Sequence, residues 1–576
     1  MSKVVLPSLC ELVAPSVAIT ALLLLPLGPI LIPRFYLIFL LFYFTFFLYT
    51  QINHVFKFYL TAKHMIYNIR RWNRHEKVNT PDAFSTSSGT NSPQPTRERY
   101  VSTLNEENLD DVEASLKFYE DSRYVHTFIV PNYCEPEALL RDTIKRLANH
   151  RNARTSYVII LAMEGSEIGH EEKGANLLNY FKNSFLHFLI TVHPPDLPGE
   201  SRGKGANVSY AARNGCNELL LRGVERRHII LTVTDSDSAI PELYVKEVDR
   251  ALALADDPYM LLLAPPIFFS RNSFEVPAAV RVTDITWSAM VMSNLSNSRG
   301  LAFPCSTYSL SMVLAERVGY WDTDADSVGE DLHMWLKCFF KTDGAARSAP
   351  IYVPINLTNV QADGYMSNMY ARYVQATRHY NGVADVAYTL KSSFGGTRSS
   401  SLMSLLPTAG TGKNAMYISP YYWLDKLIVC VHVLEAHMIP ATSGWLMFAA
   451  VPVMQLIMFP PFSFLALVEP ATNPILISDF YSTLWNIVKI ITVLLPFPLF
   501  ATLGIYEYLH RIVDRELFRK APTECRTWRN VVDYASLPIS AWMFMTLPST
   551  LACLKRLVKT DHEYIVAKKV FNEEQM

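Results

Sequence analysis

Residues 228–238 have the sequence HIILTVTDSDS, in which an apolar run ends at two acids. Isoleucine and valine favour strands, whereas aspartate is a poor strand former. The pattern therefore predicts a strand that ends just before Asp235 and Asp237. Because the chain turns at a strand end, both carboxylates can converge on a hard cation such as Mg²⁺ or Mn²⁺, which prefers oxygen ligands and shares them with phosphates. A cap or turn that closes the strand is the alternative interpretation.

Similar apolar runs lie around this one and alternate with helical patterns. Strands are predicted at 124–130, 156–162, 187–192, 228–233 and 259–268. Helices are predicted between them, at about 136–148, 170–184, 206–223 and 241–255. Strands that alternate with helices are typical of an α/β domain with a mostly parallel sheet covered on both faces. In such sheets, ligands bind at the carboxyl ends of the strands.

Two further strand ends have acids. The first predicted strand ends in Pro131-Asn-Tyr133-Cys-Glu135, and the second ends at Glu164. A single acid of this kind is ordinarily a cap or a turn residue, but three acidic strand ends favour a common ligand site. The segment ESRGKGAN (200–207) leads into an Ala-rich helix, and glycines and cations at a helix N-terminus can hold phosphate oxygens. It lacks the Walker A spacing, and a solvated basic turn is the alternative.

Two later motifs place polar groups on helices. Glu330 and Asp331 precede apolar residues at helical spacing, so they stand at a helix start. Acids are favoured there by the helix dipole alone. Gln375, Arg378 and His379 lie about one helical turn apart and share one side of a second helix. Taken alone, that helix side is an ordinary polar face.

The apolar residues concentrate at the two ends of the chain. From 14 to 49 the sequence has Arg34 as its only charge, and about 20 residues are enough for one membrane crossing. Prolines close to Arg34 predict a hairpin of two spans, and a secretory signal peptide is the alternative. Three more apolar segments lie at 441–468, 482–507 and 534–554. The last of them is either a full crossing or a re-entrant segment.

Basic residues lie next to the apolar segments, between the first hairpin and the middle of the chain and between the last two segments. Lys and Arg follow the first hairpin and fill the connection 508–533. Positive residues beside a span remain cytosolic, so the middle of the chain is expected in the cytosol. The stretch 420–440 mixes charged with apolar residues and is typical of a helix that lies in the membrane interface.

These boundaries divide the chain into seven predicted segments. They are an N-terminal transmembrane hairpin (1–56), a juxtamembrane segment with a Ser/Thr/Pro-rich linker (57–123), the α/β domain (124–390), a Gly/Ser-rich loop (391–419), an interfacial helix (420–440), a C-terminal transmembrane bundle (441–555) and a tail (556–576). The 52 basic and 53 acidic residues give a net charge of −1, so there is no reason to expect nucleic-acid binding. None of the eight cysteines forms a Cys-x-x-Cys pair, so zinc and redox motifs are not indicated.

The order and spacing of these motifs resemble the membrane-embedded glycosyltransferases of family 2, which include chitin, hyaluronan and cellulose synthases. The resemblance covers about 124–390 and is strongest for fungal-type members. It rests on the motifs at 131–135, 164, 202–207, 235–237, 330–331 and 375–379. It implies a GT-A-like, Rossmann-type cytosolic domain flanked by α-helical transmembrane segments. The chain departs from the family pattern at Glu164, where an Asp is usual, and at His379, where a Trp is usual.

The resemblance also implies a role for each motif. The residues that would hold a nucleotide-sugar are Pro131, Tyr133, Glu135, Glu164, Lys204 and Asp235. Asp237, together with Asp235, would hold the divalent cation, Mg²⁺ or Mn²⁺. Asp331 would be the general base, with Glu330 beside it. The residues that would contact the diphosphate or the acceptor are Gln375, Arg378, His379 and Cys305. The His at 379 puts the synthesis of long chains in doubt and leaves sugar transfer open.

The expected function is inverting transfer of a hexose or an N-acetylhexosamine from a nucleotide-sugar, expected to be UDP-linked, to a growing cell-wall polysaccharide. The transmembrane bundle would secrete the product, or would only anchor the enzyme. A glycolipid-forming transferase and a non-catalytic membrane receptor or transporter with a nucleotide-binding module are the alternatives. The protein is expected in the plasma membrane, with the Golgi or the ER as alternatives, and its oligomeric state is left open.

Overall fold

The fold is that of a computed structural model. The structure describes residues 8–79, 123–195, 197–201, 203–324, 326–327, 329–395, 421–459 and 472–558. Several predicted features lie wholly or mostly outside these residues: the Ser/Thr/Pro-rich linker, the Gly/Ser-rich loop, Arg202 of the candidate phosphate motif and the tail from residue 559.

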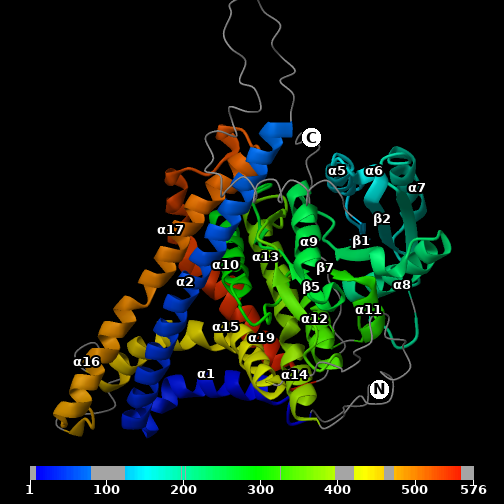
Figure 1. The fold of residues 1–576 in the computed structure, drawn as a ribbon. Coiled ribbons are helices and arrows are strands. Elements are labelled where there is room, and N and C mark those ends of the chain that lie inside the picture. Colours follow the sequence, from blue (N-terminus) through cyan, green and yellow to red (C-terminus); the bar gives the residue numbers. More distant parts are fainter. Residues whose placement is uncertain are drawn as a thin grey trace, which may run out of the picture.

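Within the described residues, a seven-stranded sheet forms the centre of the α/β domain (Figure 1). Its strands are β1 (Val125–Asn132), β2 (Tyr157–Glu164), β3 (His187–His193), β4 (Ile229–Val233), β5 (Leu261–Ala264), β7 (Tyr308–Ser311) and β8 (Arg347–Pro350). Their order is β3-β2-β1-β4-β7-β5-β8. Neighbouring strands are parallel, except that β7 runs antiparallel to both β4 and β5. The prediction of an α/β domain with a mostly parallel sheet is therefore confirmed.

The predicted strand at 259–268 forms two separate strands. After β5, the short strand β6 (Ile267–Phe268) pairs with β9 (Ile355–Asn356) in a second sheet. Two consecutive prolines (265–266) lie between β5 and β6, and proline has no N–H to donate to a ladder. The break diverts the chain from the main sheet. It brings the segment after β9 to the carboxyl end of β4.

Helices cover both faces of the sheet because successive strand residues point to opposite sides. The covering helices include α5 (Glu137–Ala148), α8 (Lys204–Leu221) and α9 (Glu242–Leu254). Phe128 of β1 lies in the core under α5 and α9, whereas its neighbour Ile129 lies in the core under α8. Gly215 allows α8 to approach β2 closely, since a Cβ at this position would collide with the side chain of Ile160.

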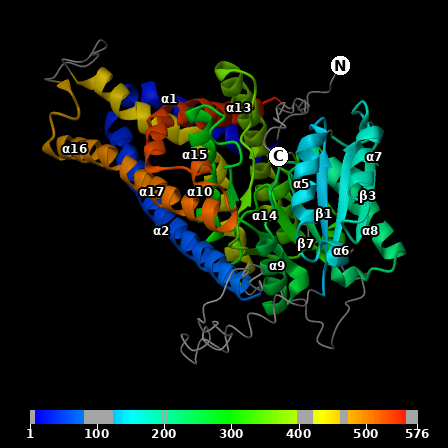
Figure 2. The same cartoon turned by 90° about the horizontal axis from the view of Figure 1, so that it is seen from above.

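Five helical segments among the described residues are long and apolar enough to cross a membrane. They contain α1 (Val13–Leu31), α2 (Pro33–Asn79), α15 (Tyr422–Met458), α16 (Asp479–Leu494) with α17 (Pro496–Ile512), and α18 (Leu537–Ala541) with α19 (Leu547–Lys555). Helix α1 packs along α15, and α2 packs along α16 and α17 (Figure 1, Figure 2). These helices are compatible with a membrane protein.

Helix α15 is continuous where the sequence predicted an interfacial helix at 420–440 followed by a separate span. Asp425, near the start of α15, is almost fully buried and forms ion pairs with Arg299 (2.5 Å) and Arg347 (2.7 Å) of the α/β domain. Asp425, one of the charged residues that suggested a helix in the interface, therefore docks α15 on the α/β domain.

Helix α10 (Ala278–Leu295) joins the α/β domain to the membrane helices. Its Arg281 forms an ion pair with Asp533 (2.9 Å), which also pairs with Arg526 (3.0 Å). Arg526 in turn pairs with Glu507 of α17 (2.6 Å), and all four side chains are buried. Breaking a buried ion pair is costly because it leaves a charge without a partner. The network therefore fixes α10 relative to the helices that follow α17.

Candidate active site

A cavity of about 1790 Å³ extends from the α/β domain to the membrane helices. Its wall begins at the carboxyl ends of β1, β2 and β4, follows α10, and continues along α2, α15 and α17. Every candidate residue from the sequence lines this cavity: Pro131, Tyr133, Glu135, Glu164, Lys204, Asp235, Asp237, Cys305, Glu330, Asp331, Gln375, Arg378 and His379. The structure thus brings motifs from distant parts of the sequence to one site.

Lys204, the first residue of α8, joins two of the acidic motifs. Its Nζ lies 2.6 Å from Oδ1 of Asp235 and 2.7 Å from Oε1 of Glu330. Asp235 follows β4, and Glu330 begins α12 (Glu330–Lys341). Burial by itself lowers the pKa of Lys204, but the two carboxylates outweigh burial and raise this pKa above its usual range. Lys204 is therefore a cation at neutral pH.

Ser306 connects Asp235 to Asp331. Its Oγ donates to Oδ2 of Asp235 at 2.6 Å, and its backbone N–H donates to Oδ2 of Asp331 at 2.7 Å. Ser306 has a φ of 63°, a conformation that non-glycine residues adopt infrequently and that clusters at functional sites. This turn of the backbone is what directs both donors of Ser306 to acids of the site.

Glu330 is buried beside two other acids. Burial raises its pKa, Lys204 lowers it, and the charges of Asp331 and Asp235 raise it further. The result is a pKa of about 7 for Glu330. The charge next to Lys204 therefore changes with pH in the neutral range.

Asp237 is more deeply buried than Asp235. Its carboxylate accepts hydrogen bonds from the hydroxyl and, at 3.2 Å, from the backbone N–H of Thr358, which follows β9. Its backbone carbonyl accepts a hydrogen bond from Arg271, which is itself paired with Asp142 of α5. These contacts fix the turn after β4, and the break between β5 and β6 is what brings Thr358 there.

Asp235 and Asp237 offer oxygen ligands to a divalent cation. In the part of the chain that the structure describes, no group of three or more His, Cys, Asp or Glu side chains is arranged to hold a metal ion by itself. Mg²⁺ and Mn²⁺ commonly bind to one or two carboxylates and complete their coordination with water and substrate phosphates. The two aspartates therefore fit a cation that is shared with a phosphate ligand, and they do not fit a closed structural metal site.

His193 contacts Glu164, although no sequence motif had indicated this histidine. His193 ends β3, and its Nδ1 lies 3.1 Å from Oε2 of Glu164 while its Nε2 lies 3.0 Å from Oε2 of Glu200. Hydrogen bonding to Glu164 raises the pKa of His193, against the effect of burial, and Glu200 adds to the rise. The position of His193 at a strand end was a signal in the sequence, but its two partners were not.

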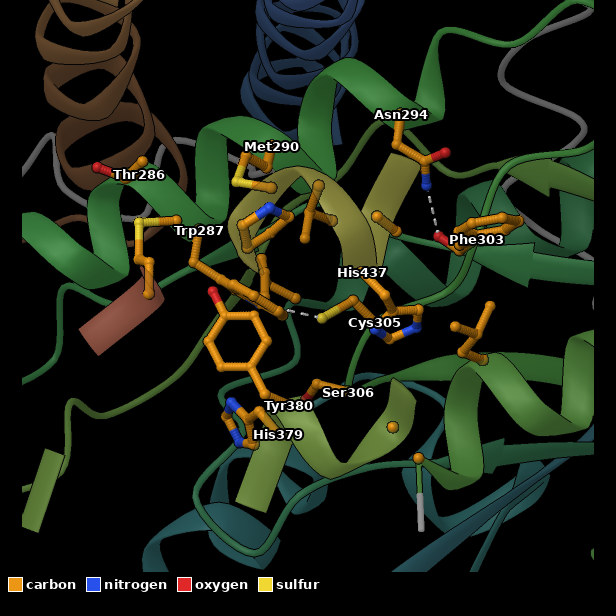
Figure 3. A pocket seen from close by; sticks show the side chains of 18 of the residues that line it. Thr286, Trp287, Met290, Asn294, Phe303, Cys305, Ser306, His379, Tyr380 and His437 are labelled. Atoms are coloured by element: carbon orange, nitrogen blue, oxygen red, sulfur yellow. Dashed lines mark hydrogen bonds between the residues drawn. The ribbon is translucent and has the colours of Figure 1, made fainter. Parts of the chain in front are cut away.

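An indole from α10 faces the candidate acceptor residues (Figure 3). The ring of Trp287 is centred 5.9 Å from that of His379, and its Nε1 donates to Sγ of Cys305 at 3.4 Å. His379 belongs to α13 (Tyr365–Tyr380), whose Gln375 accepts a hydrogen bond of 2.7 Å from Arg372. No motif marks Trp287, because it is one aromatic residue in an apolar helix.

The chain matches one family model and is weakly similar to solved structures. Residues 230–505, just under half of the chain, match the model described as Glycosyl transferase family group 2. The mannosyltransferase PcManGT from Pyrobaculum calidifontis, in complex with GDP-Man and Mn²⁺, is 14% identical, with a TM-score of 0.31 over 77% of this chain and 98% of that chain. Glucosyl-3-phosphoglycerate synthase from Mycobacterium tuberculosis, in complex with Mn²⁺, UDP and glucosyl-3-phosphoglycerate, is 14% identical, with a TM-score of 0.25 over 44% and 78%. No curated protein matches the chain.

The matched segment begins at β4 and ends in α17, so it includes both aspartates after β4, the acids at the start of α12 and the polar face of α13. This match supports a glycosyltransferase. The TM-scores are below 0.5, so the fold rests on the strand order itself.

Proposed function

We propose that this chain is a membrane-embedded, inverting glycosyltransferase of family 2. It moves a hexose or an N-acetylhexosamine from a UDP-linked donor to a growing polysaccharide. The observation that carries the proposal is the shared cavity: the acids at the ends of the strands and the residues of the membrane-length helices line the same space. A donor held by the acids is therefore open to an acceptor that enters from the membrane helices.

The donor binds across the carboxyl ends of the strands. Tyr133, Glu135 and Glu164 contact the base and the ribose, beside Pro131, and the bond between Glu164 and His193 supports this role because it fixes the carboxylate. Lys204 meets the diphosphate at the N-terminus of α8, where backbone N–H groups and the helix dipole favour anions. Asp237 and Asp235 would hold a divalent cation, Mg²⁺ or Mn²⁺, which would supply positive charge against the negative charge of the diphosphate.

Asp331 is the general base. Its carboxylate lines the cavity and is oriented by the N–H of Ser306. It removes the proton from the acceptor hydroxyl while the hydroxyl oxygen bonds to the anomeric carbon and the bond from that carbon to the diphosphate breaks. Attack from the face opposite the diphosphate inverts the anomeric configuration. Glu330 keeps Lys204 in place, and Gln375, Arg378, His379 and Cys305 contact the acceptor or the diphosphate.

The membrane helices give the product a route out of the cytosol. A polysaccharide cannot cross lipid unaided, because each desolvated hydroxyl costs several kcal/mol. The cavity continues from Asp331 past His437 and Gly444 of α15, which supports passage of the product along this wall. Secretion of a cell-wall polymer across the plasma membrane is the function that agrees with this route.

A glycolipid-forming transferase is the second candidate, and one observation favours it. Phe46 of α2, Phe448 of α15 and Phe500 of α17 line the cavity and are also exposed on the surface of their helices, by 60%, 52% and 55%. The membrane end of the cavity is therefore lined in part by exposed apolar rings. Such a lining suits the apolar chain of a lipid acceptor.

The experiment that tests the proposal uses the purified full chain in lipid nanodiscs with Mn²⁺ and each UDP- or GDP-sugar in turn. The released nucleoside diphosphate is measured, and the sugar product is sized and partitioned between water and organic solvent. A water-soluble polymer supports the synthase, and a single sugar on an extracted lipid supports the second candidate. An absence of turnover with every donor contradicts both and favours the non-catalytic alternative.

A further inference from the structure

Four ionisable side chains from two membrane-length helices line the cavity. His54 and Lys57 belong to α2, and His432 and Glu435 belong to α15. The members of each pair are three residues apart, so they share one side of their helix. Lys57 interacts electrostatically with each of the other three groups. These four side chains, here called the ionisable patch, therefore lie close together on one part of the cavity wall.

The ionisable patch lies where the uncharged parts of both helices end. In α2, residues 35–56 include no Asp, Glu, Lys or Arg, and Lys57 follows them directly. In α15, residues 436–458 include none either, and Glu435 directly precedes them. Because about 20 uncharged residues span the hydrocarbon of a bilayer, the patch is expected at the level of the lipid headgroups.

Two contacts fix the surroundings of the patch. The hydroxyl oxygens of Tyr43 in α2 and Thr442 in α15 are 3.3 Å apart, so the uncharged parts of the two helices meet beside it. The ring of His432 is centred 6.1 Å from the ring of Phe303 and is nearly perpendicular to it. Phe303 lies three residues before Ser306, which contacts the acids of the candidate active site. The patch is therefore next to the acceptor side of the cavity.

The charged groups of the patch are not paired with other side chains. Among the residues that the structure describes, Lys57 and Glu435 form no hydrogen bond and no ion pair. In the same part of the chain, Nδ1 of His432 is buried without a hydrogen-bond partner. Ionisable groups on membrane-length helices are costly, and they ordinarily serve a ligand or a pathway. The patch therefore offers a positive charge and imidazole groups to a ligand in the cavity.

Apolar rings continue from the patch along the same helices. Phe46 lies about 16 Å from Lys57 along the axis of α2, and Phe448 lies about 20 Å from Glu435 along that of α15, at about 1.5 Å per residue. Together with Phe500 of α17, both rings line the cavity and are more than half exposed. The wall therefore suits a ligand that has one polar head and an apolar chain.

We propose that the ionisable patch binds the phosphate group of a membrane lipid whose chain lies against these exposed rings. Lys57 pairs with the phosphate, and His54 and His432 donate hydrogen bonds to its oxygens. The carboxylate of Glu435 disfavours a ligand with negative charges at several positions, such as an acidic polysaccharide, so a single phosphate is favoured. The inference goes beyond the proposed function, because lipid binding requires no sugar transfer.

The test uses the purified full chain in phosphatidylcholine nanodiscs, to which dodecyl phosphate is added at increasing mole fraction. Binding is measured as a rise in Tm, because a ligand that binds only the folded chain stabilises it. Dodecanol has the chain without the phosphate, inorganic phosphate lacks the chain, and cellotetraose is a neutral glycan. We expect dodecyl phosphate to raise the Tm and the other three probes to leave it unchanged.

Two substitutions in the patch are expected to have opposite effects. Lys57→Gln removes the cation, so the mole fraction of dodecyl phosphate that gives half of the Tm rise should increase at least about tenfold. Glu435→Gln removes a repelling charge, so this mole fraction should decrease about threefold. Lys63→Gln is the matched control, since Lys63 is exposed on α2 and does not line the cavity. It should bind the lipid as wild type does.

Equal binding of dodecyl phosphate by wild type and Lys57→Gln would overturn the inference. So would a Tm rise that dodecanol or inorganic phosphate produces equally well, or one that only cellotetraose produces. If Lys57→Gln does not fold, Glu435→Gln decides, because unchanged or weaker binding in that variant also overturns the inference. Wild-type protein that binds dodecyl phosphate and turns over no sugar donor contradicts the proposed function alone. Turnover without binding of dodecyl phosphate contradicts this inference alone.

Discussion

The ammonium group of Lys204 lies 2.6 Å from a carboxylate oxygen of Asp235, although one residue begins a helix and the other follows a strand. Ser306 also contacts Asp235, and Glu330 also contacts Lys204. Because the pair joins the end of β4 to the starts of α8 and α12, it links the candidate phosphate motif to the candidate base.

Replacement of Lys204 tests this link. Lys204→Met leaves the buried Glu330 and the partly exposed Asp235 without their cation, so we expect the free energy of unfolding to fall by about 3 kcal/mol and the affinity for UDP with Mn²⁺ to fall at least tenfold. Chemical unfolding and calorimetry measure the two effects. Lys145→Gln, on the exposed side of α5, is the control and should change neither. Unchanged UDP affinity in Lys204→Met would contradict a diphosphate role.

Removal of the base should affect the rate without affecting donor binding. For Asp331→Asn we expect kcat to fall by about 10²–10⁴-fold, because the amide accepts no proton, and we expect UDP affinity to stay within twofold of wild type. Steady-state kinetics and calorimetry measure these quantities. Asp256→Asn on an exposed loop is the control. Near-wild-type turnover in Asp331→Asn would assign the base elsewhere.

Removal of divalent cations should abolish turnover reversibly. We expect EDTA to stop release of nucleoside diphosphate and added Mn²⁺ or Mg²⁺ to restore it, because the leaving diphosphate needs its charge offset. Asp237→Ala should stay inactive at every cation concentration. Thr358→Ser is the matched control, since it retains the hydroxyl that donates to Asp237. Full activity in EDTA would mean that Lys204 alone offsets the charge.

The raised pKa of Glu330 predicts a pH dependence of stability. Its pKa of about 7 in the folded chain exceeds the ordinary value of 4.5, so the folded protein binds this proton more tightly than the unfolded one. The stabilisation is fully present below about pH 4.5 and is lost as the pH rises to about 7. We expect the free energy of unfolding to fall across this window in wild type, and to fall less in Glu330→Gln. The free energy of unfolding is measured by urea unfolding at pH values across this window. An equal fall in wild type and in Glu330→Gln would contradict the assignment.

Replacement of Trp287 should weaken acceptor binding and leave the use of the donor unchanged. Its ring lies beside His379, which we propose contacts the acceptor, so we expect Trp287→Ala to raise the acceptor KM about tenfold, in line with the loss of about 1.4 kcal/mol from one aromatic contact. Donor hydrolysis in the absence of acceptor should continue at the wild-type rate. Trp287→Phe retains a ring and should lie between the two. Equal acceptor KM values in all three proteins would exclude contact with the acceptor.

Strands β1 to β5 and the acids that follow β1, β2 and β4 could be predicted because the signals are local. A run such as Ile229–Val233 favours a strand by its own composition, and Asp235 follows it in any context. The one misassigned strand was also a local matter, since the prolines at 265–266 were enough to divide it. The start of α12 at Glu330 was predicted in the same way, from helical spacing and acids in the first turn.

The amino-acid sequence by itself indicated β1 to β4, the start of α12 and most of the membrane-length helices, because these depend on residue preferences and on periodicity within about twenty positions. It did not indicate β7, β8, β9 or α10, or the continuity of α15. Only the tertiary structure decided which groups meet in the cavity. Strand β7 runs antiparallel between β4 and β5, and Lys204 pairs with Glu330. Trp287 lies beside His379, and His333 forms an ion pair with Asp385. Each of these contacts joins segments that are far apart along the chain, so no local sequence pattern indicates it. The geometry of the contacts follows from the packing of whole helices and strands against one another.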